Sequence, residues 1–331
     1  LRNFNRDFMP LDRDRVLAKF REFEGVLREG EQAPTEYLPG GIYITRRETG
    51  AGPQDARYTE RVRQALKDLL GLADVFDVVV GVSTGAGVGG YYLAGEKQMF
   101  LGTSIYYTEF SGTRFINYRR TKKIIDVGLI SEVMRRGRTK MDMEAIKTSR
   151  SKFFAGVTNA ETGNGGWIDA KSATPDVVSA IEASSAMPLG YNLPVAVNQR
   201  HYYDGGMSLP CPIREVCEKF QPTDVLVLPN RPLRFGSQLS RELTDRVFAA
   251  VALRNLPTFL RTAVISRHKR FHEGMNYVQD CNGINVGVLW PPEMGIHQLT
   301  RSSSKLRAAA QASVEKTLEV FGQPEKKFDL L

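Results

Sequence analysis

The chain has 331 residues, of which 42% are hydrophobic and 25% are charged. These proportions are typical of a folded globular protein, and they exclude a disordered chain, a fibrous chain and a small disulfide scaffold. Domains commonly hold about 100–200 residues, so the length allows one large domain or two ordinary ones. The 45 basic and 37 acidic residues give a net charge of +8, which favours anionic partners.

The distribution of charge limits the possible partners, and the cysteine content indicates the cellular compartment. The basic residues are spread along the chain, so we expect no nucleic-acid partner. The three cysteines form no C-x-x-C pair, which predicts neither a metal site nor a disulfide framework. Reduced thiols indicate a cytoplasmic location, with peripheral membrane contact as an alternative. The longest charge-free stretch, residues 78–95, contains six glycines, and we therefore expect no transmembrane segment.

The expected elements begin with an amphipathic helix at residues 12–29, which leads into a polar linker. We interpret residues 1–40 as an N-terminal helical appendage and residues 41–331 as the main domain. From residue 42 onward, short apolar runs alternate with helical patterns, as is typical of an α/β fold with a largely parallel central sheet. Strands are predicted at residues 42–45, 76–80, 152–158, 194–197, 201–203, 224–228 and 284–289. Helices are predicted at residues 56–70, 176–184, 239–272 and 301–321.

A serine lies where the apolar strand at residues 77–80 meets a helical pattern. Residues 81–85 read G-V-S-T-G, which fits the G-x-S-x-G sequence of a nucleophile elbow. Such a turn needs small flanking residues, and it exposes the side chain of Ser83 at the edge of the sheet. The N-terminus of the following helix would favour an anionic intermediate. A glycine-rich turn that binds phosphate, or that only packs tightly, is the alternative interpretation.

A serine nucleophile needs a general base, and the sequence offers two candidates. His297 follows the last predicted strand, which is where an α/β-hydrolase triad has its histidine. His268 and His272 fall within a predicted basic helix and are more typical of a solvated surface. Asp204 ends a short apolar run and precedes two glycines, where an aspartate can either act as the base or simply cap the turn.

Three segments taken together resemble the patatin-like phospholipase family, particularly its bacterial branch. They are the strand and elbow at residues 76–85, the A-S-S-A-M-P segment Ala183–Pro188, and the Y-D-G-G segment Tyr203–Gly206. Their order and spacing match over about residues 42–321. The resemblance implies a three-layer α/β/α fold and a Ser-Asp dyad that works without histidine.

The same resemblance implies a role for each motif. Ser83 would be the nucleophile that accepts the acyl group, Asp204 would be the general base, and Ala183–Pro188 would shape the approach to the site. The motif glycines would be Gly81, Gly85, Gly205 and Gly206. The implied protein is a serine acyl hydrolase, a phospholipase or lipid esterase, that acts on a lipid or membrane-surface substrate without metal or other cofactor.

One loop departs from the family's pattern. The family has a G-G-G-x-R/K-G loop after its first strand, whose N–H groups stabilise the oxyanion, whereas residues 49–56 here read T-G-A-G-P-Q-D-A. Gly50, Ala51 and Gly52 remain as candidate oxyanion donors, because the proline that follows has no N–H. Asp55 adds a negative charge that opposes an oxyanion. The alternative prediction is therefore a catalytically weak or silent lipid-binding protein.

Two basic segments could either contact an anionic partner or form a solvated surface. Residues 106–123 mix aromatic side chains with five basic ones. An interfacial enzyme could use such a mixture to bind anionic lipid. The alternative is an ordinary helix with a solvated basic face. Residues 241–270 are also basic and are more typical of a solvated outer helix face.

Overall fold

The computed structural model describes residues 42–45, 76–120, 124–188, 193–230, 253, 256–280, 284–289, 291–292, 295–296 and 300–320. The predicted appendage at residues 1–40 and the predicted helix at residues 56–70 lie outside these ranges.

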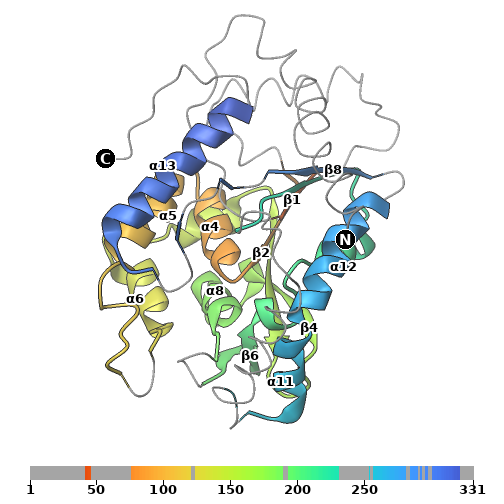
Figure 1. The fold of residues 1–331 in the computed structure, drawn as a ribbon, viewed down its shortest axis with the longest axis horizontal. Coiled ribbons are helices and arrows are strands. Elements are labelled where there is room, and N and C mark those ends of the chain that lie inside the picture. The colour runs from red at the N-terminus through yellow and green to blue at the C-terminus, as the bar shows by residue number, and fades with distance from the viewer. Residues whose placement is uncertain are drawn as a thin grey trace, which may run out of the picture.

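The described strands form one eight-stranded sheet, which runs through the centre of the molecule (Figure 1). Seven strands follow in the order β5-β6-β3-β2-β1-β7-β8, and β4 pairs with β3. The strands are β1 Ile42–Thr45, β2 Val78–Val82, β3 Lys152–Asn159, β4 Gly165–Asp169, β5 Val195–Val197, β6 Arg200–Asp204, β7 Asp224–Val227 and β8 Asn285–Val288. All seven predicted strands are therefore present, within two residues at their ends.

The prediction of a largely parallel sheet is wrong, because the sheet is mixed. Of the described pairings, β2 with β3 and β7 with β8 are parallel, and the other five are antiparallel. An apolar run indicates a strand buried on both faces, but it carries no information on direction. The residues of a short turn do carry information on strand direction. In the β5–β6 hairpin, Asn198 and Gln199 have φ values of 49° and 63°, as a two-residue turn between antiparallel strands requires.

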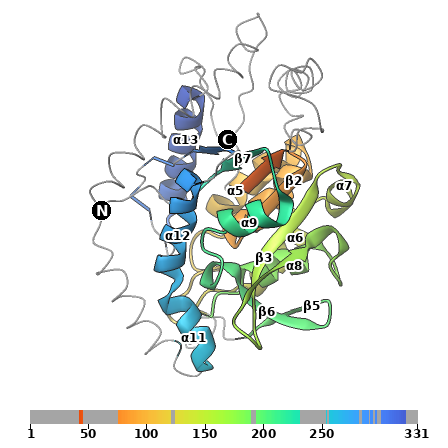
Figure 2. The same ribbon diagram turned by 90° about the vertical axis from the view of Figure 1, so that its right-hand side faces the viewer.

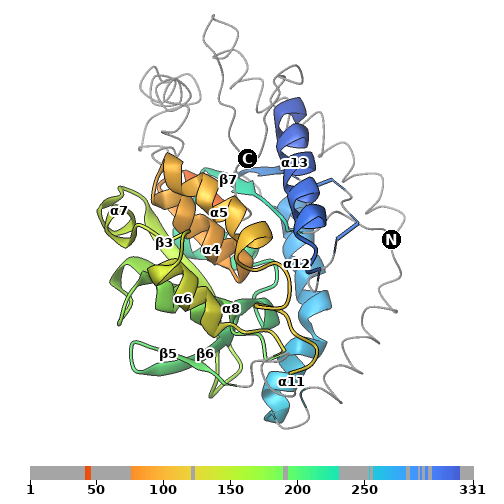
Figure 3. The same cartoon turned by 90° about the vertical axis from the view of Figure 1, so that its left-hand side faces the viewer.

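Helices cover both faces of the sheet, which confirms the three-layer α/β/α prediction. Alternate residues of β2 point to opposite faces: Val79 packs into the core beside α4, whereas Val78 and Val80 pack against α9. Figure 3 looks onto α4, α5 and α6, and Figure 2 looks onto α9. The described helices are α4 Thr84–Leu93, α5 Glu96–Thr108, α6 Gly128–Arg136, α7 Met143–Thr148, α8 Val177–Ser185, α9 Ile213–Phe220, α11 Thr258–Ile265, α12 Arg267–Asp280 and α13 Ser303–Val320.

The helix predicted at residues 239–272 is not one continuous helix in the part that the structure describes. It includes α11 and only the first six residues of α12, and these two helices follow one another along one side of the molecule (Figures 1 and 2). Pro257 directly precedes α11, and its carbonyl accepts the first hydrogen bonds of that helix, from the N–H groups of Leu260 and Arg261. The helices meet at Ser266, whose hydroxyl donates to the Thr262 carbonyl at 2.8 Å, a bond that competes with regular helix geometry.

Helix α11 packs against the end of β6. A small apolar cluster joins Tyr203 of β6 and Met207, just beyond it, to Leu260 and Val264 of α11. The residues that follow β6 are therefore enclosed by a helix more than 50 positions later in the chain. None of the helices described is long and apolar enough to cross a bilayer.

The basic aromatic segment at residues 106–123 is helical only as far as Thr108, so the interpretation of one ordinary helix is wrong. The described residues beyond it form turns and bends, with one isolated β-bridge from Ile116 to Ile125. Tyr118 is 51% exposed there, and the guanidinium of Arg301 lies 4.7 Å from its ring centroid. Arg114 pairs with Glu109 and Glu132, which reduces the free positive charge of this surface.

Candidate active site

Ser83 occupies a strained turn between β2 and α4. Its φ of 55° and ψ of −124° belong to a region that residues with side chains rarely adopt. The turn is so tight that a Cβ atom on Gly81 would lie 2.4 Å from both the Gly85 carbonyl oxygen and the Ala86 Cα. Position 81 therefore requires glycine. The turn leaves the Ser83 side chain partly exposed at the end of the strand.

Asp204 approaches this serine from the end of β6. Val82 pairs with Gly156 of β3, and Asp204 pairs with the next residue, Val157. The ends of β2 and β6 thus lie at consecutive positions along β3. Ser83 Oγ donates a hydrogen bond of 2.7 Å to Asp204 Oδ2, so these two side chains are in direct contact.

The second oxygen of the Asp204 carboxylate is also engaged. Oδ1 accepts from the Gly206 N–H at 2.6 Å, so one carboxylate both caps the turn and contacts the serine. The Asp204 carbonyl accepts from Thr158 Oγ1 at 2.8 Å. A Cβ atom on Gly205 would lie 2.1 Å from the Gly156 carbonyl oxygen, which makes glycine necessary there too. With only 2% of its surface exposed, Asp204 is fixed in position.

Sequence reasoning missed the part played by the last turn of α8. The Ser83 N–H donates to Ser184 Oγ at 2.8 Å, and Ser184 Oγ donates to the Gly156 carbonyl at 2.6 Å. Two residues later, the Ala186 carbonyl accepts from the Asp204 N–H at 3.1 Å. The signal in the sequence was a serine on the apolar, inward face of a helix, where a buried hydroxyl needs partners.

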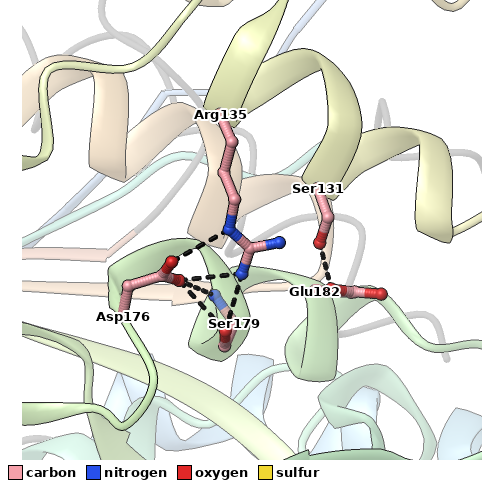
Figure 4. A network of polar contacts seen from close by, with 5 residues as sticks. All are labelled: Ser131, Arg135, Asp176, Ser179 and Glu182. Atoms are coloured by element: carbon pink, nitrogen blue, oxygen red, sulfur yellow. Dashed lines mark hydrogen bonds and ion pairs between the residues drawn. The ribbon is translucent and has the colours of Figure 1, made fainter.

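A polar network fixes α8 against α6 (Figure 4). Arg135 donates to both carboxylate oxygens of Asp176 at 2.9 Å and to Ser179 Oγ at 2.7 Å. Burial raises the pKa of Asp176, but hydrogen bonds from Arg135 and Ser179 outweigh it and lower that pKa below its usual value. Burial raises the pKa of Glu182, which accepts a hydrogen bond from Ser131. The helix whose C-terminal end reaches Ser83 is thus anchored along its length.

The local electrostatics favour negative charge beside Ser83 Oγ. Helix α4 begins at the next residue, Thr84, and the partial positive charge of a helix N-terminus lies at its first turn. No group of three or more histidine, cysteine, aspartate or glutamate side chains that could bind a metal occurs among the described residues. The arrangement provides a hydroxyl, a carboxylate to take its proton, and a helix N-terminus.

Most of the other predicted site residues fall outside the part of the chain that the structure describes. Gly50, Ala51, Gly52 and the alternative base His297 lie outside the described residues, as does Asp55. His268 and His272 lie on α12, and both are partly buried rather than fully solvated.

The chain matches the family model described as patatin-like phospholipase over residues 62–216. This segment contains Ser83, Ser184 and Asp204. No curated protein matches the chain. Assignment to a bacterial branch stays a prediction. The elbow, the sheet and the match agree, and residues 62–216 therefore belong to the patatin-like phospholipase family.

Proposed function

We propose that this protein is a serine acyl hydrolase that cleaves lipid carboxylic esters, with Ser83 as nucleophile and Asp204 as general base. Membership of the patatin-like phospholipase family supports lipid acyl hydrolysis in general. The observation that carries the residue assignment is the 2.7 Å hydrogen bond from Ser83 Oγ to Asp204 Oδ2, which lies within the reach that proton transfer needs.

Acylation uses that hydrogen bond as the proton path. Ser83 Oγ attacks the ester carbonyl carbon while its proton passes to Asp204 Oδ2. The tetrahedral intermediate then collapses, the bond from the carbonyl carbon to the alcohol oxygen breaks, and the leaving alcohol takes the proton from Asp204. The products of this half-reaction are a free alcohol and an acyl ester on Ser83.

Deacylation repeats the sequence with water. Asp204 takes a proton from water, whose oxygen attacks the acyl carbon. The bond to Ser83 Oγ breaks, the serine regains its proton from Asp204, and the fatty acid leaves. The same carboxylate is base and acid in both halves, so no histidine is needed.

The oxyanion requires N–H donors, and the loss of one donor costs about 10²–10³ in rate. We propose that the loop Gly50–Gly52 supplies them. The departures at Pro53 and Asp55 favour the alternative of a weak or silent lipid-binding protein. We further propose that residues 41–331 form the hydrolase domain, with residues 1–40 as an appendage, in a cytoplasmic protein that contacts membranes peripherally.

A fluorophosphonate probe, which phosphonylates an activated serine, separates the two functions. We expect wild type to be labelled and to hydrolyse phospholipid vesicles, and Ser83→Ala to do neither. Asp204→Asn should slow labelling about 10²–10⁴-fold, because general-base catalysis contributes that much. Absence of both labelling and hydrolysis in wild type would favour the lipid-binding alternative, and persistent labelling of Ser83→Ala would assign the nucleophile elsewhere.

Asp169→Asn is a matched control. Asp169 also ends a strand, and its carboxylate also caps a short 3₁₀ helix, by accepting from the N–H of Lys171 at 3.1 Å. It lies at the end of β4 and is exposed. We expect Asp169→Asn to keep the wild-type labelling rate, so that slow labelling of Asp204→Asn is due to the contact with Ser83 rather than to the loss of a carboxylate charge at a turn cap.

A further inference from the structure

The backbone N–H of Ser83 needs a partner that α4 cannot provide. The N–H groups at the start of a helix have no acceptor within that helix. The Ala86 N–H closes the first turn on the Ser83 carbonyl at 2.9 Å, but the Ser83 N–H itself points away from the helix, to Ser184 Oγ. The acceptor therefore comes from a residue 101 positions later in the chain.

The Ser184 hydroxyl has a fixed orientation. A serine hydroxyl carries one proton and two lone pairs. Ser184 gives its proton to the Gly156 carbonyl at 2.6 Å, so a lone pair is left to face the Ser83 N–H. The side chain is fully buried, and water cannot replace either partner. One hydroxyl thus joins the elbow, α8 and β3.

The same turn of the chain holds Asp204. The Ala186 carbonyl accepts the Asp204 N–H, so Ser83 and Asp204 are both hydrogen-bonded to a segment of three residues. The conformation of Ser83 is one that persists only when its surroundings determine it. Among the described contacts of this residue, the bond to Ser184 acts directly on its backbone.

We propose that Ser184 is a positioning residue for acyl transfer: its hydroxyl fixes the elbow backbone so that Ser83 Oγ keeps its contact with Asp204. This inference rests on the proposed function. It has a second consequence for the same site. Because the Ser83 N–H is already bound to Ser184 Oγ, it does not serve as an oxyanion donor, and the donors are other N–H groups.

The first test measures turnover and labelling in Ser184→Ala. A displacement of about 1 Å at a reacting group can cost about 10²-fold in rate, so we expect kcat and the fluorophosphonate labelling rate to fall about 10–100-fold. KM should change less than about twofold, because Ser184 is buried beneath the elbow. Ser184→Cys, which keeps a weak donor and acceptor, should recover part of the rate and provides the measurement if Ser184→Ala does not fold.

Ser104→Ala is the matched control. Ser104 is also buried, but its hydroxyl donates to the Leu101 carbonyl within its own helix, α5. We expect the wild-type rate per folded molecule. If Ser184→Ala and Ser184→Cys lower only the stability and label at the wild-type rate per folded molecule, Ser184 has a structural role alone and the proposal is wrong.

A second test needs no activity. Hydrogen exchange of the Ser83 amide, followed by NMR, reports the bond to Ser184 directly. We expect the Ser83 amide to exchange at least about tenfold faster in Ser184→Ala, while the Val80 amide within β2 is unchanged. Unchanged Ser83 exchange would overturn the proposal. If instead wild type neither labels nor hydrolyses while exchange responds as expected, the proposed function fails and the fixing of the elbow by Ser184 stands.

Discussion

Replacing Gly205 by alanine tests whether the close approach of two backbone segments sets the position of Asp204. A Cβ atom there would lie 2.1 Å from the Gly156 carbonyl oxygen and 2.5 Å from its carbon. Carbon and carbonyl oxygen atoms normally approach to about 3.3 Å, so the segments must separate by about 1.2 Å. Both contacts are backbone atoms, and no side chain can rotate to relieve them.

The expected result is a loss of both stability and reactivity. Overpacking of this kind costs about 1–3 kcal/mol of unfolding free energy. Asp204 is the preceding residue, and a shift of about 1 Å relative to Ser83 should slow fluorophosphonate labelling about 10²-fold. Urea unfolding measures the first quantity, and labelling of the folded variant measures the second.

Gly166→Ala provides the control. This glycine lies on β4, beside the same strand β3, but a Cβ atom there would meet nothing within 4 Å. We expect no loss of stability, and a gain of about 0.5–1 kcal/mol because alanine reduces the freedom of the unfolded chain. A folded Gly205→Ala that labels as fast as wild type would refute the claim that this contact positions Asp204.

Three further substitutions probe the supports of the site. Thr158→Val removes the hydroxyl that donates to the buried Asp204 carbonyl and should lower the unfolding free energy by about 1–3 kcal/mol in urea. Burial raises the pKa of Glu182 above its usual 4.5. The contribution of this side chain to stability is therefore fully present below pH 4.5 and is lost as the pH rises through the raised pKa. The unfolding free energy measured against pH should show this fall in wild type and not in Glu182→Gln. Asp176→Asn should keep the helix cap but lose the ion pair with Arg135. Asp176→Ala should lose both, and its unfolding free energy should be about 1 kcal/mol lower than that of Asp176→Asn.

Each of these has a contrary outcome. Equal stability of Thr158→Val and wild type would mean that the Asp204 carbonyl has another partner of equal strength. Parallel pH profiles for Glu182→Gln and wild type would mean that Glu182 does not titrate in this range. Equal stability of the asparagine and alanine variants at position 176 would exclude the cap as a source of stability.

The elbow could be predicted from the sequence because its geometry depends on local residue types. Gly81 and Ser83 occur directly after an apolar strand, and a sharp turn between strand and helix needs a residue without a side chain. The structure has this turn, and the Gly81 contact supplies the reason. The position of Asp204 at the end of a short strand was predictable in the same way.

The partners of that turn could not be predicted, because they depend on distant pairing. Whether β1 runs parallel or antiparallel to β2 is decided by the whole connection between them, not by the apolar residues of either strand. Ser184 lies 101 residues from Ser83 in the sequence, and only the packing of α8 onto β3 brings its hydroxyl to the elbow. The separation of two residues in the sequence therefore does not predict the distance between them in the fold.

The apolar cluster between α11 and the end of β6 has a consequence for how such a protein can diverge. Met207 lies inside the family segment, but Leu260 and Val264, which cover it, lie outside residues 62–216. A fragment that ends at residue 216 would expose Met207 to water. Conversely, changes in α11 can shift the residues that flank Asp204, Tyr203 and Met207, while every motif residue stays the same. Two proteins with identical motifs can therefore differ in how the end of β6 packs, and the difference would come from a helix that the shared segment does not contain.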